Sequence, residues 1–103
     1  MDADGNIIFE NSAALKMFDR EEKEMLGQHA HSIIHHHHAD GTGYLVEECP
    51  IYLTLHDGKV RRVDNEVYFR KDGSSFPIEY ICSPTIESTG KISGVVVVFR
   101  DIT

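Results

Sequence analysis

The sequence has little cysteine, little positive charge and no long hydrophobic run. Its two cysteines, Cys49 and Cys82, are too few for a disulfide framework, and this favours a reducing, cytoplasmic setting. Lysine and arginine number 10 against 17 aspartates and glutamates, and the net charge of −7 argues against nucleic acid or anionic lipid as a direct partner. No stretch approaches the ~18 apolar residues of a membrane span. The chain opens on polar residues, which do not form a signal peptide.

The length and composition predict one soluble domain over residues 1–103. The chain has enough residues for one modest core. A hydrophobic content of 41% and a charged content of 26% are ordinary for a globular protein.

The C-terminal segment 94–103, Gly-Val-Val-Val-Val-Phe-Arg-Asp-Ile-Thr, is the strongest strand signal in the chain. Four valines and a phenylalanine favour a pleated strand because they are β-branched or aromatic. Alternation places Val95, Val97 and Phe99 on one face and Val96 and Val98 on the other. Apolar side chains on both faces predict a central strand that is covered on both sides.

The N-terminal third predicts a turn, a short strand and two helices. Asp4-Gly5 is a turn dipeptide, and Asn6–Glu10 reads as a strand. Asn11-Ser12 offers a cap for a helix through Phe18. Asp19 is expected to cap the next helix, with Glu22 in the capping-box position and Gly27 as its terminator.

Residues 28–45 show the least regular pattern and hold six of the seven histidines. Beyond them, Pro50 suits the first position of a helix because it has no backbone N–H to pair there. A helix is therefore expected from Pro50 to His56, with Cys49 at its cap and Gly58 just past its end.

After Gly58 the hydrophobic period changes to two. Residues 63–70 and 76–83 alternate as two half-buried strands, joined by the turn 71–74. A second turn around residues 88–90 leads to the C-terminal strand. Three strands joined by turns make an antiparallel meander, and the short helices are expected on one of its faces. The fold class is α+β.

This pattern resembles the PAS domains of bacterial signalling proteins, such as sensor histidine kinases and diguanylate cyclases. The resemblance is carried by the order and spacing of pieces along nearly the whole chain: Asp4–Asn11 with Ala13-Ala14, Gly27, Lys71–Ser74 with Phe76-Pro77, Ser83-Pro84, and Gly94–Thr103 with its Asp-Ile-Thr ending. A further piece, His36-x-His38-x-Asp40-Gly41 followed by Tyr44 and Cys49-Pro50, is similar to a subgroup of these domains.

The resemblance implies a sensory input module of a larger protein, with an effector domain in the same parent chain. In the family, a first strand lies beside the closing strand, and here it is missing before Asp4, so the domain is expected to be truncated at its N-terminus. We therefore expect a homodimer, formed by strand exchange or through the apolar outer face of the closing strand. Asp101 and Thr103 match the tripeptide that ties this strand to the following linker.

The histidine-rich stretch and Cys49 are the candidates for a metal or redox switch. Imidazole and thiolate are good ligands for zinc, copper or iron, so His36, His38 and Cys49 form one hypothetical site. The spacing fits no standard zinc finger, and the simpler interpretation is that His38 and Asp40 hydrogen-bond to fix the loop. Cys49 at a helix N-terminus is also a redox candidate, although no resolving partner is evident.

The sequence contains few signals for haem, flavin or catalysis. His56 is the one haem-ligand candidate, and no Asn-Cys-Arg-type motif of flavin-binding relatives is present. The ligand-pocket candidates are His38, Asp40, Tyr44, Tyr52 and Tyr80. The sequence leaves the cofactor unknown, with none as the simplest expectation. Because phosphate loops and nucleophile elbows are lacking, the domain is not expected to be an enzyme.

Overall fold

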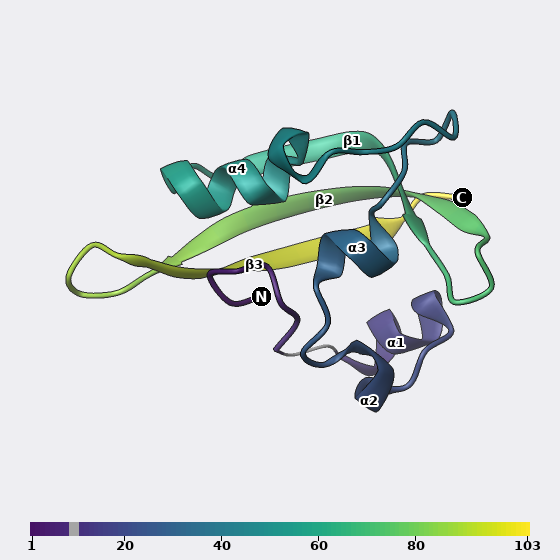
Figure 1. Ribbon diagram of the computed structural model, residues 1–103, viewed down its shortest axis with the longest axis horizontal. Coiled ribbons are helices and arrows are strands. Elements are labelled where there is room, and N and C mark those ends of the chain that lie inside the picture. Colours follow the sequence, from purple (N-terminus) through teal and green to yellow (C-terminus); the bar gives the residue numbers. More distant parts are fainter. Residues whose placement is uncertain (9–10) are drawn as a thin grey trace.

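The computed structural model describes residues 1–8 and 11–103. Three antiparallel strands form one sheet in the order β1-β2-β3: β1 (Arg61–Phe69), β2 (Ser75–Ile86) and β3 (Ile92–Asp101) (Figure 1). The predicted meander is confirmed. The prediction of a central closing strand is wrong, because β2 is central and β3 lies at an edge. On the outer face of β3, Val96 is 52% exposed and Val98 is 67% exposed.

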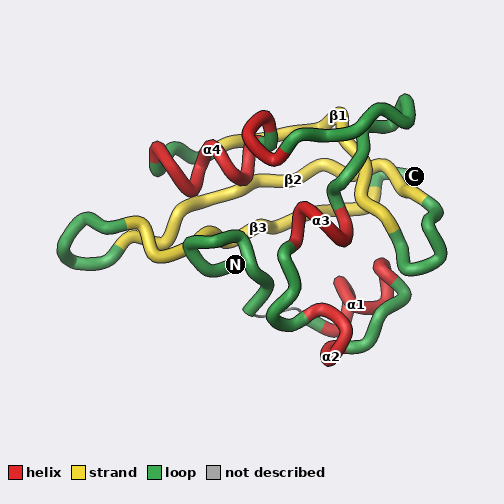
Figure 2. The backbone as a smooth tube through the Cα atoms, viewed as in Figure 1, coloured by secondary structure: helices red, strands yellow, loops and turns green. Residues whose placement is uncertain are grey.

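The helices gather on one face of this sheet, which confirms the α+β arrangement (Figure 2). They are α1 (Ser12–Phe18), α2 (Glu22–Met25), α3 (Ala30–Ile34), the 3-10 helix η1 (Val46–Glu48) and α4 (Pro50–Asp57). Helix α4 packs against all three strands, and α3 packs against β1. Among the described residues, no helix is long and apolar enough to cross a membrane.

Caps at the helix ends agree with the predictions in part. The Asn11 side chain accepts a hydrogen bond from the backbone N–H of Ala14, as its cap position predicts. Asp19 was predicted to cap α2, and this prediction is wrong. The residue instead ends α1 in a left-handed conformation with φ of 56°. Helix α1 extends through Phe18 and so takes Asp19 into its own C-terminus. The capping box of α2 is formed instead by Glu21 and Glu24.

The segment before α1 is not the predicted strand over its described part. Gly5 adopts a positive φ of 82° in a turn with Asp2, as Asp4-Gly5 predicts. Asn6 then forms one isolated bridge to His29, and Ile7 exchanges backbone hydrogen bonds with residues 27–28. The rest of that predicted strand, Phe9 and Glu10, lies outside the described residues.

The N-terminus lies beside β3. Met1 and Val95 exchange backbone hydrogen bonds of 2.9 Å and 3.1 Å, and Asp2 forms a bridge with Gly94. Figure 1 shows the N-terminus next to β3. Within the described residues, the sheet has three strands, so the expected first strand is represented only by this short pairing.

A β-bulge in β1 changes which residues face the helices. Val63 lies opposite Tyr80, but Glu66 lies opposite Ile78, so β1 contains one residue more than β2 over this interval. Beyond the bulge, Glu66 and Tyr68 share the inner face with Val63. Strict period-two alternation over residues 63–70 predicts Glu66 and Tyr68 on the face opposite to Val63. That prediction is wrong for the half of the strand after the bulge.

Aromatic side chains build the core between α1 and the sheet. Phe18 is fully buried, and its ring lies 5.4–5.9 Å from those of Tyr68, Phe76 and Phe99. These contacts attach the helical layer to all three strands. The packing is typical of aromatic clusters, in which tilted rings are preferred to face-to-face stacks.

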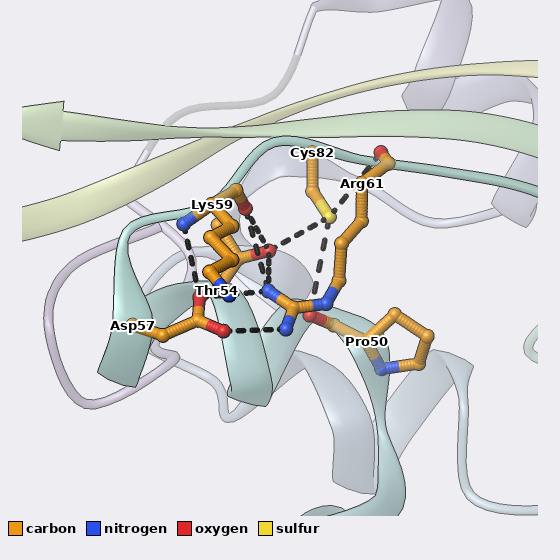
Figure 3. Close-up of polar contacts among 6 residues, drawn as sticks. All are labelled: Pro50, Thr54, Asp57, Lys59, Arg61 and Cys82. Carbon is orange, nitrogen blue, oxygen red and sulfur yellow. Dashed lines mark hydrogen bonds and ion pairs between the residues drawn. The ribbon is translucent and has the colours of Figure 1, made fainter.

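A cluster of hydrogen bonds joins the C-terminal end of α4 to the start of β1. The Arg61 guanidinium donates to both carboxylate oxygens of Asp57, at 2.8 Å and 2.6 Å, and to the Thr54 hydroxyl at 3.0 Å (Figure 3). The buried Thr54 hydroxyl donates to the Lys59 carbonyl and lies 3.4 Å from Cys82 Sγ. As predicted, α4 begins after Cys49 at Pro50, and Gly58 follows its end with a positive φ of 73°.

Candidate functional site

A cavity of about 320 Å³ lies between the N-terminal segment, α3, η1, α4 and β1. Most of its wall is apolar, but several groups that can bind protons or metals reach it. Its lining includes His31, Ile34, His35, Val46, Cys49 and Tyr68.

Glu66 is the centre of a buried polar cluster beside this cavity. One carboxylate oxygen accepts a 2.6 Å hydrogen bond from the Tyr80 hydroxyl and lies 2.8 Å from His35 Nε2. The other accepts a short hydrogen bond from the Tyr44 hydroxyl. Burial acts to raise the pKa of Glu66, but the hydrogen bonds from His35, Tyr44 and Tyr80 outweigh it, and the pKa is lowered. Glu66 is therefore held as a carboxylate.

The pKa values of the two tyrosines shift in the opposite direction to that of Glu66. Burial and the hydrogen bond to Glu66 raise the pKa of both Tyr44 and Tyr80 far above the ordinary value. Both hydroxyls therefore remain protonated donors to the carboxylate.

His35 connects this carboxylate to Cys49. Its side chain is only 2% exposed, and its Nδ1 lies 3.4 Å from Cys49 Sγ. Since Nε2 points at the Glu66 carboxylate, the arrangement fits an Nε2–H tautomer whose Nδ1 lone pair accepts from the thiol. The side chains of Cys49, His35 and Glu66 thus form one continuous chain of polar contacts.

His31 lies on the same side of α3, one turn before His35. Its Nε2 lies 2.6 Å from the backbone carbonyl oxygen of Tyr44, which fixes a proton on that nitrogen. Its Nδ1 is buried and has no hydrogen-bond partner among residues 1–8 and 11–103. Burial lowers the pKa of His31, so the neutral imidazole is favoured.

Cys49 is the N-cap of α4 and is 1% exposed. Burial raises the pKa of its thiol to about 11, against the opposing effect of backbone N–H groups of Tyr52 and Ile51. A redox-sensing cysteine requires an accessible thiolate, and the burial of Cys49 disfavours both access and the thiolate.

The structure brings Cys49 together with different histidines from those predicted. The donor atoms of His31, His35 and Cys49 all lie within 4.8 Å of one another and could hold a metal ion. In the described chain, this grouping contains neither His36 nor His38. His36 stacks on Phe69 and lies 2.6 Å from His37 between their Nδ1 atoms, while His38 stacks on Tyr44 with ring centroids 3.9 Å apart.

The remaining candidates occupy separate positions. Asp40 is exposed and accepts hydrogen bonds from the N–H and hydroxyl of Thr42, rather than the predicted contact with His38. Tyr52 lines the cavity and packs on His56, which is exposed at the other end of α4. At the C-terminus, Asp101 accepts hydrogen bonds of 2.9 Å and 2.6 Å from the N–H and hydroxyl of Thr103.

Comparison with known proteins identifies the family. The profile of the PAS domain family matches residues 1–103, the whole chain. The chain belongs to the PAS domain family. No curated protein sequence gives a significant match.

Solved PAS structures show the same fold. The PAS domain of an HTR-like protein from Haloarcula marismortui is 22% identical, with a TM-score of 0.71 over 99% of this chain and 77% of that one. A PAS domain from Colwellia psychrerythraea is 21% identical, with a TM-score of 0.76 over 99% and 81% of the two chains. The LOV domain of the blue-light photoreceptor Aureochrome1, in its dark structure, is 19% identical, with a TM-score of 0.74 over 97% and 68%.

PAS domains are sensory signalling modules rather than catalysts. Within this one, the residues that sequence reasoning did not single out are Glu66, His31 and His35. The four-residue spacing of the two histidines would have placed them on one face of a helix, had a helix been predicted at Ala30–Ile34. The inward direction of Glu66 depends on the bulge, which carries no glycine or proline signal in the sequence.

Proposed function

We propose that this PAS domain is the sensory input module of a two-component sensor histidine kinase in the cytoplasm, and that occupancy of its cavity sets the signal. The supporting observation is the cavity of about 320 Å³, whose wall includes His35, the residue that contacts the Glu66 carboxylate. Protein cavities of this size, with apolar walls and a few convergent polar groups, are typical ligand sites. The two cysteines, both unpaired and buried, suit a reducing compartment.

A route from the cavity to the C-terminus follows the polar cluster and the sheet. Glu66 on β1 is bonded to Tyr80 on β2, and Tyr80 lies opposite Phe99 on β3. Two residues beyond Phe99, the Asp101 side chain bonds to Thr103 at the C-terminal end of the chain. A ligand that shifts His35 or Glu66 would therefore bias two arrangements of the sheet and of an effector domain that follows it.

The order Cys49, His35 and Glu66 also resembles a nucleophile, a base and an orienting carboxylate. This is not proposed as a catalytic site, because burial raises the pKa of the Cys49 thiol to about 11 and the side chain is 1% exposed. A catalytic cysteine needs the opposite, a lowered pKa and access to substrate.

The cavity proposal is tested by native mass spectrometry and thermal unfolding of the purified domain. Val46→Trp places a large side chain in the cavity wall, whereas Leu45→Trp changes the adjacent residue, which is 61% exposed. We expect a bound small molecule, or a library compound that raises Tm, to be lost in Val46→Trp and retained in Leu45→Trp. Equal binding by both variants would contradict the cavity as the sensing site. An absorbance spectrum reports haem or flavin directly.

A second candidate function is ligand-free dimerisation through β3. The alternation set by the Met1–Val95 pairing leaves the backbone N–H and C=O groups of Val97 and Phe99 facing the outer edge of the sheet. A hollow of about 490 Å³ runs along this edge, between β3 and the side chains of Ile8 and Met17. Among the described residues, no further strand pairs with this edge, and an unpaired edge next to exposed valines is a ready surface for a second copy, by edge pairing or strand exchange.

Sedimentation of the domain over a range of concentrations tests this second candidate. Val98→Lys adds a charge to the outer face of β3, and Val60→Lys adds the same charge at a residue that is 63% exposed but lies outside the strand. We expect a dimer that is weakened at least about 10-fold by Val98→Lys, as for a charge at the centre of an apolar interface, and unchanged by Val60→Lys. A monomer at all concentrations would exclude this function.

A further inference from the structure

We propose that the side chains of His31, His35 and Cys49 form a binding site for a transition metal ion of borderline or soft character, with Zn²⁺ as the best-fitting example. One ring nitrogen of His31, one ring nitrogen of His35 and the Cys49 Sγ lie within 4.8 Å of one another. The site is formed by His31 in α3, by the C-cap residue of α3, His35, and by the N-cap residue of α4, Cys49. The inference stands on this donor geometry and goes beyond the sensory role proposed above.

Both imidazoles are held in the orientation and tautomer that metal binding requires. His35 Nε2 lies 2.8 Å from the Glu66 carboxylate, and His31 Nε2 lies 2.6 Å from the Tyr44 carbonyl oxygen. Each acceptor keeps the proton on Nε2, so each Nδ1 carries a lone pair. The lone pair of His35 faces the Cys49 thiol, which loses its proton when a metal binds. Metal-binding histidines in proteins are oriented by the same two kinds of outer partner, a carboxylate or a backbone carbonyl.

The outer partner Glu66 is itself fixed. The Tyr44 and Tyr80 hydroxyls both donate to it, so its lone pairs are directed before any ion arrives. This preorganisation reduces the rearrangement that binding would need.

A buried ring nitrogen is a second, independent observation that points to a metal ion at this site. Among the described residues, His31 Nδ1 is buried without a hydrogen-bond partner, an arrangement that destabilises a fold. The contact between His35 and Cys49 satisfies those two side chains. No hydrogen bond among the described residues satisfies the His31 nitrogen. A metal ion shared by the three side chains would satisfy it.

The separation between His35 and Cys49 matches that in a tetrahedral site. A zinc ion bound to one imidazole and one thiolate separates their donor atoms by about 3.6 Å, from bond lengths of about 2.1 Å and 2.3 Å. His35 Nδ1 and Cys49 Sγ are already 3.4 Å apart. Two nitrogens and one sulfur exclude Mg²⁺ and Ca²⁺, which prefer oxygen ligands.

The fourth coordination position would open toward the cavity, since all three residues line it. Metal sites with three protein ligands keep this position for water or an exchangeable ligand. On binding, the thiol proton of Cys49 passes to solvent and the thiolate sulfur becomes the ligand. If the proposed sensory function holds, a small molecule in the cavity could bind the metal directly.

Titration of the metal-depleted domain with Co²⁺ tests the site without requiring any variant. We expect one Co²⁺ per chain, with the intense d–d bands of a tetrahedral ion and a near-ultraviolet charge-transfer band from thiolate to Co²⁺. Zn²⁺ should displace Co²⁺ and remove both features. Native mass spectrometry supplies the stoichiometry. A wild-type domain that binds Co²⁺ without the thiolate band, or does not bind it, overturns the proposal.

Variants distinguish this site from the exposed histidines. Cys49→Ala should abolish the charge-transfer band, whereas Cys82→Ala, at the other buried cysteine, should retain it. The triple variant with alanine at residues 36, 37 and 38 should also retain it. Loss of binding in the triple variant, with retention in Cys49→Ala, would assign the metal to the loop and overturn the proposal.

Glu66→Gln tests the positioning role of the carboxylate. We expect Zn²⁺ affinity, measured by competition with a chromophoric chelator, to fall about 10- to 100-fold while the thiolate band persists. Circular dichroism of each metal-free variant reports folding separately. The result is independent of ligand binding in the cavity, so a domain that takes up neither Co²⁺ nor Zn²⁺ but still binds a small molecule would disprove the metal site and leave the sensory proposal standing.

Discussion

The imidazole of His35 and the carboxylate of Glu66 are 2.8 Å apart in the interior of the domain. The pair joins the helical layer to β1, and the two tyrosines that also bond to Glu66 extend the connection to β2 and to the loop before η1. A buried carboxylate with three donors is stable only while all of its partners are present, because each unpaired group would be left out of water.

Glu66→Gln should therefore destabilise the metal-free domain by about 1–3 kcal/mol. Glutamine keeps the shape but loses the charge, and its NH₂ group faces hydroxyl and N–H donors that need an acceptor. Chemical denaturation with a two-state fit measures the free energy of unfolding. Glu79→Gln is the control, since Glu79 forms an exposed ion pair with Arg100 and should change stability by less than about 1 kcal/mol. Equal effects at both positions would mean that the buried network contributes nothing beyond a surface ion pair.

Residue pattern alone was sufficient for the elements whose signals are local. Helix α4 was predicted within one residue, because Pro50 can start a helix and Gly58 can end it. The strands and hairpins of the meander followed from period-two alternation and turn residues. Family resemblance added the fold, and the comparison across the whole chain confirmed it.

The site was less predictable because it depends on register and on packing. The direction of Glu66 is set by one extra residue in β1, and a one-residue shift moves every later side chain to the other face. The exposed state of Val96 and Val98 depends on the sheet order, which the strand's own composition cannot specify. Helix α3 has only five residues, too few for a periodic pattern to be recognised.

Phe18→Ala should destabilise the domain by about 3–5 kcal/mol, the usual cost of removing a buried phenylalanine. The ring is fully buried and contacts aromatic rings from each of the three strands, so the neighbouring backbone cannot easily close the cavity. Denaturant unfolding measures the change. Phe18→Leu, which retains much of the volume, should recover part of the loss. A cost below about 1 kcal/mol would show that α1 is not packed on the sheet as described.

The left-handed conformation of Asp19 predicts an order of stability for two substitutions. Asp19→Gly should be more stable than Asp19→Ala by about 1 kcal/mol, because a φ of 56° is strained for a residue with a Cβ atom. The control is the same pair at Lys16, an exposed position within α1. There alanine should be more stable than glycine by about 1 kcal/mol, because helix propensity decides. If alanine is preferred at both positions, Asp19 does not end α1.

The Asp57–Arg61 pair predicts a change in stability with pH. The side-chain hydrogen bond from Arg61, and then the backbone N–H of Lys59, lower the pKa of Asp57 from its ordinary value of 3.8. A carboxylate whose pKa is lower in the folded state stabilises the fold above its unfolded pKa, and this contribution disappears as the pH falls through the folded pKa. Wild type should therefore exceed Asp57→Asn in Tm at about pH 6, and the difference should shrink steadily below about pH 4. Asp64→Asn, on the exposed bulge of β1, is the control and should show no such convergence. A difference that stays constant from neutral to acid pH would show that the Asp57 charge does not hold α4 to β1, and that the hydrogen bonds of Thr54 with Lys59 and Arg61 make that junction alone.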